Sequence, residues 1–441
     1  MYTGLGARPD AAQGKSSRKG AFNGTVLALG FTSFFSDISS EMVAAVIPLF
    51  LTVQLGFSPA AFGLFQGVYE LANASLRLAG GVVADRTQKP KETAALGYGV
   101  STVTRAGLVA SALGGVTPVP FLLADRLGKG LRTAPRDAMI SLATPQSAWG
   151  TAFGVHRTLD ATGALIGPLL AFLLLRLIPG GFDSIFVASF AFGVVGVAII
   201  GTQVRNPTIP HQRPPSRLRT SIIEQFRIPG FRRIVLVGAA LSTFTVADSL
   251  VYLVIWNSSK AESSIGVTGF GMEWFPLLFA GTAVVFLTFA TPVGRLADRV
   301  GRARVWLAGH AFLLAVYVLL WTGSTSTPAI IGILALLGLY YASTDGVLPA
   351  LAAGVIPADR RSGGLAILAT SIALAKMVSA TAFGLIWHRY GADSAVLVAA
   401  VGLTTTACFA LFTALDHPSP HLKDAKAPED AKTPEDAKPE A

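Results

Sequence analysis

Long apolar stretches recur along the chain, and they constrain its fold more than any other feature. Each has about 20 residues or more, which at about 1.5 Å per residue suffices to cross the roughly 30 Å hydrocarbon core of a bilayer. In lipid, a spanning backbone must satisfy its own hydrogen bonds, so the spans are expected to be helices of an all-α polytopic membrane protein. The twelve predicted spans are 24–53, 60–84, 93–115, 119–143, 150–175, 183–204, 234–256, 266–292, 304–322, 328–355, 364–387 and 394–415.

The composition agrees with a membrane protein. The 441 residues are 52% hydrophobic and only 14% charged, and the mean hydropathy is +0.57, which is too apolar for a soluble chain of this length. The net charge of +10 would suit a nucleic-acid partner, but the basic residues stand between the spans. We therefore expect a lipid bilayer and no nucleic acid around this protein. A single cysteine, Cys408, leaves no disulfide framework or cysteine metal cluster.

The connections between spans differ in charge. Those on the side of the N-terminus hold most of the Lys and Arg, whereas the opposite ones offer only Arg176, Lys260 and Arg389. Basic residues concentrate in cytoplasmic loops, so both termini are expected in the cytoplasm and the protein in the bacterial inner (plasma) membrane.

The same pattern predicts a division of the chain. A polar cytoplasmic tail (1–22) precedes a bundle of six spans (23–204), and a second bundle of six (234–415) precedes a low-complexity cytoplasmic tail (416–441) that is expected to be disordered. The bundles are separated by a Pro- and Arg-rich cytoplasmic linker, 205–233.

An internal repeat supports the six-plus-six division. The sequence Gly-x-x-Ala-Asp-Arg stands at the cytoplasmic end of the second span and again at that of the eighth. Glycine permits close approach of a neighbouring helix, and aspartate can meet a helix N-terminus. The two copies are Gly81, Asp85 and Arg86, and Gly294, Asp298 and Arg299.

With this motif the sequence resembles the major facilitator superfamily (MFS) of secondary transporters. The family's Gly-x-x-x-Asp-Arg-x-Gly-Arg motif is matched by residues 294–302, while Gln88 replaces the second glycine in the first half. The resemblance covers nearly all of 23–415. It implies two pseudo-symmetric six-helix bundles that alternate access to a midplane cavity, with the motif copies latching the halves on the cytoplasmic side. We expect a monomer without a cofactor.

The fourth predicted span carries cations where lipid cannot solvate them. Arg126, Lys129 and Arg132 recur on one helix face. A charge near the bilayer centre costs from about 2.5 to over 10 kcal/mol, so this face is expected to point at a water-filled cavity. The alternative is that Arg132 and Arg136 extend to an interface. Arg126 to Gly130 is also similar to the family's Arg-x-x-x-Gly pattern, whose arginine is associated with proton coupling.

The fifth span contains Gly154, Gly163 and Gly167-Pro168. This spacing resembles the fifth-helix motif of proton-coupled antiporters in the drug-efflux branch, although Ala171 and Phe172 stand where two glycines are usual. Close helix packing with a kink is the alternative interpretation.

Acidic residues inside the spans are candidates for proton coupling. Asp37 and Glu41 are four residues apart on one helix face, about 20 Å from the helix start. There they can hold and release a proton as access alternates, with the cationic face as counter-charge, or they can form a permanent bridge. Asp160 in the fifth span joins this set.

In the second half, Asp248 and Asp345 are isolated intramembrane charges. They could bind a cationic group or pair with Lys376.

The sequence holds no phosphate-binding loop, metal-ligand spacing or dinucleotide turn, so an enzyme is not indicated and energy must come from an ion gradient. We expect proton-driven export (antiport) of a small amphipathic compound, in which protonation of Asp37 or Glu41 weakens their pairing with Arg126 or Lys129. The alternatives are proton-coupled symport of a small organic anion, which the cationic face suits, and a non-transporting membrane scaffold or sensor.

Overall fold

The computed structural model describes residues 23–87, 89–204, 225–263, 270–357 and 361–415, and the regular structure of these residues is helical. The predicted tails and most of the predicted linker lie outside the described residues. The helices of the first half are α2 (Gly24–Leu49), extended by the π-helical turn η1 (Phe50–Gln54), α3 (Pro59–Thr87), α4 (Pro90–Ala112), α5 (Val119–Leu142), α6 (Trp149–Leu177) and α7 (Phe182–Gln203). Those of the second half are α9 (Pro229–Ser242), α10 (Asp248–Ser263), α11 (Phe275–Val300), α12 (Arg302–Trp321), α13 (Thr327–Thr344), α14 (Val347–Val355), α15 (Arg361–Tyr390) and α16 (Ala392–Leu415).

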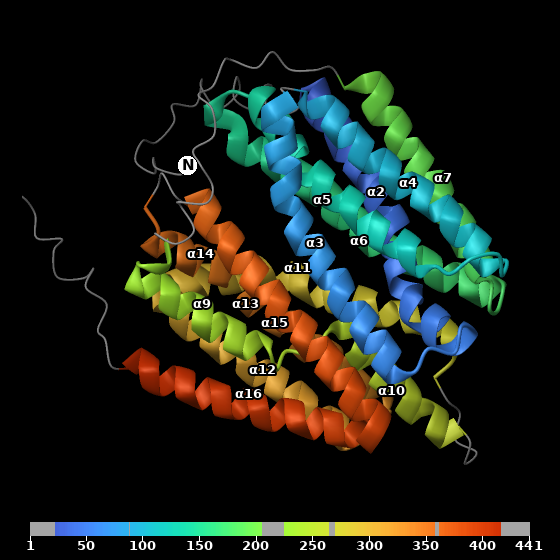
Figure 1. Cartoon of the computed structure of the whole chain (residues 1–441), viewed down its shortest axis with the longest axis vertical. Helices are drawn as coiled ribbons and strands as arrows, with labels where there is room; N and C mark the ends of the chain where they lie inside the picture. The colour runs from blue at the N-terminus through green and yellow to red at the C-terminus, as the bar shows by residue number, and fades with distance from the viewer. Residues whose placement is uncertain (1–22, 88, 205–224, 264–269, 358–360, 416–441) are drawn as a thin grey trace, which may run out of the picture.

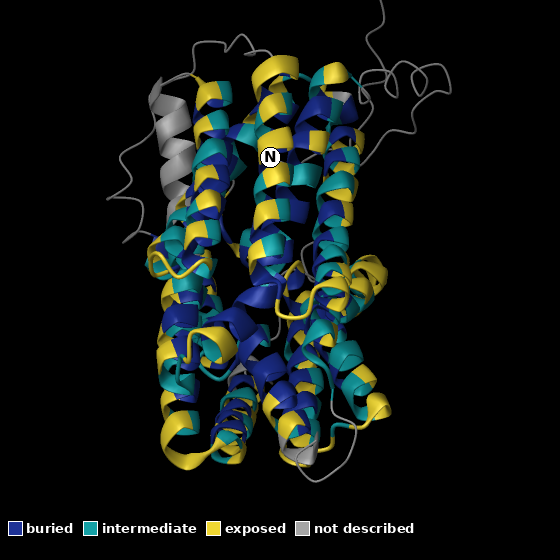
Figure 2. Ribbon diagram, turned by 90° about the vertical axis from the view of Figure 1, so that its right-hand side faces the viewer, coloured by how far each residue is buried: buried dark blue, intermediate teal, exposed yellow. Residues whose placement is uncertain are grey.

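The helices gather into two bundles, α2 to α7 and α9 to α16 (Figure 1). The bundles meet mainly where α3 lies against α15 and α6 against α11. This arrangement confirms the predicted all-α fold of two six-span bundles. Buried residues lie between the helices and exposed ones cover the outside (Figure 2). Many of the exposed side chains are large and apolar, such as Val103 and Phe412, as expected of surfaces that face lipid.

Eight helical stretches among the described residues are long and apolar enough to cross a membrane by length and composition alone. The remaining spans fall short for two reasons. Helices α3, α4 and α5 carry many polar and charged residues, and α9 and α10 are each too short. In α4 and α5, charged side chains are buried against other helices, among them Arg105, Asp125, Arg126 and Arg132.

The seventh and tenth spans were predicted to be continuous, and this prediction is wrong. In the seventh span, α9 ends at Ser242 and α10 begins at Asp248. In the tenth span, α13 ends at Thr344 and α14 begins at Val347. At the first break, the Tyr317 hydroxyl on α12 accepts from the Val246 N–H and donates to the Phe244 carbonyl, both at 2.8 Å. A broken helix can persist at membrane depth where neighbouring side chains satisfy the freed backbone groups.

Several helix boundaries also differ from prediction, and two of these differences concern the linker and the repeated motif. Helix α9 begins at Pro229, inside the predicted linker, because proline suits the first helical position and Phe231 is fully buried. Helix α11 continues to Val300, eight residues past the predicted end at 292, so the second motif copy is itself helical.

The bundles contact each other closely at one end of the molecule, here called the closed end, where α3 begins and α15 ends (Figure 1). A Cβ on Gly63 of α3 would lie 2.4 Å from the Ala380 carbonyl oxygen, and one on Gly384 of α15 would lie 2.4 Å from the Pro59 oxygen. The two helices therefore meet backbone to backbone, which only glycine allows.

Candidate functional site

The cationic face of α5 points into the first bundle. Arg126 and Arg132 are 6% and 2% exposed, and the side chain of Lys129 is 27% exposed. Arg132 does not extend to an interface, so that alternative is wrong for this residue. Helix α5 fits closely against α4, since a Cβ on Gly128 would lie 2.6 Å from the Gly97 oxygen.

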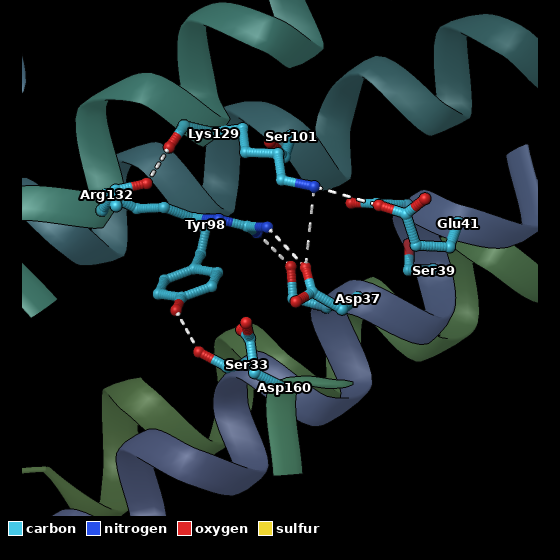
Figure 3. Close-up of polar contacts among 12 residues, drawn as sticks. Ser33, Asp37, Ser39, Glu41, Tyr98, Ser101, Lys129, Arg132 and Asp160 are labelled. Carbon is cyan, nitrogen blue, oxygen red and sulfur yellow. Dashed lines mark hydrogen bonds and ion pairs between the residues drawn. The ribbon is translucent and has the colours of Figure 1, made fainter. Parts of the chain in front are cut away.

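Two of these cations contact the predicted carboxylates of α2 (Figure 3). The Arg132 guanidinium lies 3.1 Å from Asp37, and the Lys129 ammonium lies 3.0 Å from Glu41 and 4.0 Å from Asp37. The Arg132 guanidinium also stacks over the Tyr98 ring at 4.5 Å. The four charges thus form a cluster between α2 and α5, in which Lys129 contacts both carboxylates.

Arg126 has a different partner from the one predicted. It pairs with the neighbouring Asp125 at 2.6 Å and stacks over the Tyr69 ring at 4.6 Å, rather than pairing with Asp37 or Glu41. Asp125 also lies 2.8 Å from the buried Arg105 of α4. Sequence reasoning did not assign Asp125 a role, although two intramembrane arginines require a carboxylate between them.

Asp160 on α6 extends the cluster toward the end that carries Asn23. It lies 3.5 Å from Arg136, which in turn donates to Ser33 at 3.3 Å. The Ser33 hydroxyl lies 3.0 Å from both the Tyr98 hydroxyl and the His156 Nε2 (Figure 3 shows the Tyr98 contact). Polar groups therefore follow one another along α2 from Glu41 to Ser33.

The glycines of α6 hold this helix against α2. A Cβ on Gly163 would lie 2.4 Å from the Phe34 oxygen, and one on Gly167 would lie 2.8 Å from the Met42 nitrogen. Pro168 is buried within the same helix. The close-packing interpretation is thus supported at Gly163 and Gly167, whereas a Cβ on Gly154 would meet nothing within 4 Å.

A cavity of about 260 Å³ lies between the two bundles. A second, of about 290 Å³, adjoins it and is lined in part by Asp345 and His310. Glu70 and Lys376 line both cavities. The charged residues lining the first are Glu41, Glu70, Arg126, Asp248 and Lys376.

The structure therefore separates the predicted site residues into two sets. Glu41, Arg126 and Asp248 line the first cavity and Asp345 lines the second, whereas Asp37, Lys129, Arg132 and Asp160 line neither. Asp248, at the start of α10, accepts a hydrogen bond from the Tyr341 hydroxyl. Within the described chain, neither Asp248 nor Asp345 forms the predicted ion pair with Lys376.

The second motif copy joins α11 to its neighbours. Asp298 pairs with Arg302 at 2.8 Å, and Arg302 donates to the Ala350 carbonyl of α14 at 3.2 Å. Gly301 allows the intervening turn, since its φ is +113°. A Cβ on Gly294 would meet nothing within 4 Å, so the expected close helix approach is not made at this residue in this conformation.

The remaining motif residues take no part in a described contact. Arg299 is exposed. Gly81, Asp85 and Arg86 lie in α3, but their side chains are outside the described residues.

Similar proteins were found by sequence and by structure. The family model described as Major Facilitator Superfamily matches residues 29–272 and 248–438. An uncharacterized MFS-type transporter of Methanocaldococcus jannaschii is 27% identical over 82% of this chain and 88% of its own length. A multidrug resistance protein of Photorhabdus laumondii is 23% identical over 67% of each chain. The crystal structure of the nucleoside transporter NupG superposes with a TM-score of 0.71 at 16% identity, covering 89% of this chain and 100% of its own.

Two helical bundles around a charged cavity, inside a lipid-facing apolar surface, define a membrane transport protein rather than an enzyme. The chain belongs to the Major Facilitator Superfamily. It is thus a multi-pass secondary transporter that binds a small-molecule substrate within the membrane.

Proposed function

We propose that this transporter couples proton entry to export of a small amphipathic compound. The observation that carries the proposal is the cluster of Asp37, Arg132, Lys129 and Glu41. Asp37 is buried and lines neither cavity, Glu41 lines the first cavity, and Lys129 contacts both carboxylates. A change of protonation on either carboxylate therefore alters charge at the cavity surface.

The cluster suggests an order of events. A proton on Asp37 removes the counter-charge of Arg132 and one of the two carboxylates that hold Lys129. The Lys129 ammonium then depends on Glu41 alone, at the cavity surface. We infer that this redistribution favours substrate release on the side from which the proton came, and that proton release on the other side restores the cluster.

The proposed topology orients the molecule in the membrane. With both tails in the cytoplasm, the closed end faces outward and the cavity is accessible from the cytoplasm, where an exporter loads its substrate. The proposed bundles, 23–204 and 234–415, then rock about the cavity. The similarity to multidrug resistance proteins supports efflux of an amphipathic compound.

Symport of an organic anion is the second candidate, and one observation favours it. Arg126 lines the cavity, and in the described chain its buried Nε has no hydrogen-bond partner. However, the α5 cations already have the carboxylates of Asp37, Glu41 and Asp125 beside them. This neutralisation leaves less positive charge for an anionic substrate than the sequence suggested.

The test uses purified protein in liposomes that contain a pH-sensitive dye. A panel of amphipathic compounds is screened for substrate-dependent proton movement, first with the unmodified protein. Asp37→Asn is expected to abolish proton movement, whereas Asp183→Asn, in the exposed first turn of α7, should leave it unchanged. Substrate flux with no proton movement, or full coupling in Asp37→Asn, would refute the proposal. Cotransport of protons with an anion in one direction would support the second candidate.

A further inference from the structure

Glu70 of α3 and Lys376 of α15 lie where the two cavities adjoin, since both residues line both cavities. Asp248 lines one cavity and Asp345 the other. Lys376 thus lines the two cavities together with three carboxylates. The arrangement spans the two bundles, because α3 belongs to the first and α10, α13 and α15 to the second.

Among the lining residues that the structure describes, the charges of these cavities do not balance. Glu41 and Arg126 are each paired with a residue of the first bundle, Lys129 at 3.0 Å and Asp125 at 2.6 Å. The remaining lining charges are the carboxylates of Glu70, Asp248 and Asp345 against the ammonium of Lys376. In formal charge, three anions face one cation.

No described cation lies within ion-pair distance of these three carboxylates. Glu70 accepts a hydrogen bond from the neutral Gln66 amide at 3.2 Å, and Asp248 accepts one from the Tyr341 hydroxyl. Each pairing leaves the negative charge uncompensated, which is unfavourable in a largely apolar surrounding. A bound cation would relieve this cost.

A second observation points to a ligand in the first cavity. The Ser249 side chain lines this cavity and is 7% exposed, and its hydroxyl has no hydrogen-bond partner among the described residues. Buried hydroxyls are normally hydrogen-bonded, so the Ser249 hydroxyl is free to form a hydrogen bond with a group bound in the cavity. The rings of Phe65 and Phe279 line the same cavity and offer apolar surface.

We propose that Glu70, Asp248 and Asp345 form a subsite for a cationic group of the substrate, and that Lys376 is a built-in competitor for this subsite. In the empty protein the Lys376 ammonium partly compensates the three carboxylates. A substrate cation takes over this role, with its apolar part against Phe65 and Phe279. The inference rests on the proposed function only in treating the cavity as the substrate site.

If Lys376 and the substrate cation compete for the carboxylates, removing the ammonium and removing a carboxylate should change cation affinity in opposite directions. Removing the ammonium with Lys376→Met should tighten cation binding about tenfold, because the carboxylates lose their internal partner. Removing a carboxylate with Asp248→Asn should weaken it about tenfold, as expected for a charged contact in a partly buried site. Lys376→Arg keeps the positive charge and should not tighten cation binding.

The experiment measures equilibrium binding of radiolabelled tetraphenylphosphonium to the protein in lipid nanodiscs, with empty nanodiscs subtracted. Tetraphenylborate, which has nearly the same shape and the opposite charge, serves as the competitor and is expected not to displace it from the protein. Glu273→Gln removes a carboxylate that pairs with Arg176 outside both cavities and should bind like the unmodified protein. Thermal unfolding of each variant establishes that it is folded.

Several results would overturn the inference. They are weaker cation binding in Lys376→Met, unchanged binding in Asp248→Asn, saturable tetraphenylborate binding that depends on Lys376, or no saturable phosphonium binding to any variant. The assay has no proton gradient, so these results leave proton coupling untouched. Conversely, cation binding with the predicted order of affinities, but without proton movement in liposomes, would contradict the proposed function alone.

Discussion

The guanidinium of Arg105 lies 2.8 Å from the carboxylate of Asp125, so that α4 and α5 are joined by an ion pair inside the first bundle. Asp125 lies 2.6 Å from Arg126 as well, and one carboxylate thus serves two buried cations. Neither arginine could be left unpaired in this surrounding without a large desolvation cost. The Arg105–Asp125 pair is therefore expected to affect both the stability of the bundle and the shape of the cavity wall.

We predict that Asp125→Asn destabilises the protein strongly, by about 3–5 kcal/mol, because it leaves two buried guanidiniums without a counter-charge. Thermal unfolding of the purified protein measures the effect. The control is Asp137→Asn, since the Asp137 side chain is 45% exposed and pairs with Arg136. That change should cost less than about 1 kcal/mol. Equal losses in both variants would contradict the structural role of Asp125.

Arg132→Gln is expected to lower gradient-driven flux at least about tenfold, because Asp37 loses a charge-assisted contact of about 1.5–3 kcal/mol. Proton-coupled flux in liposomes measures this. Arg232→Gln, on the first turns of α9 and outside both cavities, serves as the control. Normal coupled flux in folded Arg132→Gln protein would remove Arg132 from the mechanism.

Gly163→Ala and Gly154→Ala are expected to change stability in opposite directions. A Cβ at position 163 would lie 2.4 Å from the Phe34 carbonyl oxygen, whereas one at position 154 would meet nothing within 4 Å. The first variant should lose about 1–3 kcal/mol by overpacking. The second should gain up to about 1 kcal/mol, because alanine is the better helix former. Unfolding midpoints of the two proteins decide, and a similar effect of both changes would argue against close packing of α6 on α2.

A cross-link at the closed end should stop transport reversibly. Arg176 on α6 lies 3.5 Å from Glu273, which precedes α11 in the other bundle. After Cys408→Ser, which removes the one native thiol, Arg176→Cys with Glu273→Cys places a thiol on each bundle. A short cleavable bifunctional thiol reagent is expected to abolish flux, and cleavage of its linker to restore it. Each single-cysteine variant should keep its flux after treatment, and full flux in the cross-linked double variant would mean that this end need not open.

Hydropathy predicted the number and approximate bounds of the spans, because apolar length is what a bilayer selects. It did not predict the break between Ser242 and Asp248. The residues of that break are no less apolar than their neighbours, and what stabilises it is a hydroxyl on α12, that of Tyr317. Such a contact depends on packing between distant segments, which a local pattern does not report.

The sequence also predicted only part of the site, because contacts between distant segments again decided the rest. Charge inside a span is costly wherever it occurs, so Asp37, Glu41, Lys129 and Arg132 could be selected from the sequence, and the structure brings them together. The partner of Arg126 could not be predicted from the sequence. It depends on the rotation of α5 about its axis and on a rotamer that reaches the adjacent Asp125. Helical spacing shows which residues share a face but not which residues of other helices meet that face.

At the closed end, α3 and α15 meet at Gly63 and Gly384, which have no side chains. Parting these two glycines releases no rotamers and rejoining them freezes none, so this contact adds no side-chain entropy to the step. What is lost on parting is mainly dispersion, at about 0.1–0.2 kcal/mol for each atom pair. A modest preference of a bound molecule for one arrangement of the bundles is then enough to change which end of the transporter is shut.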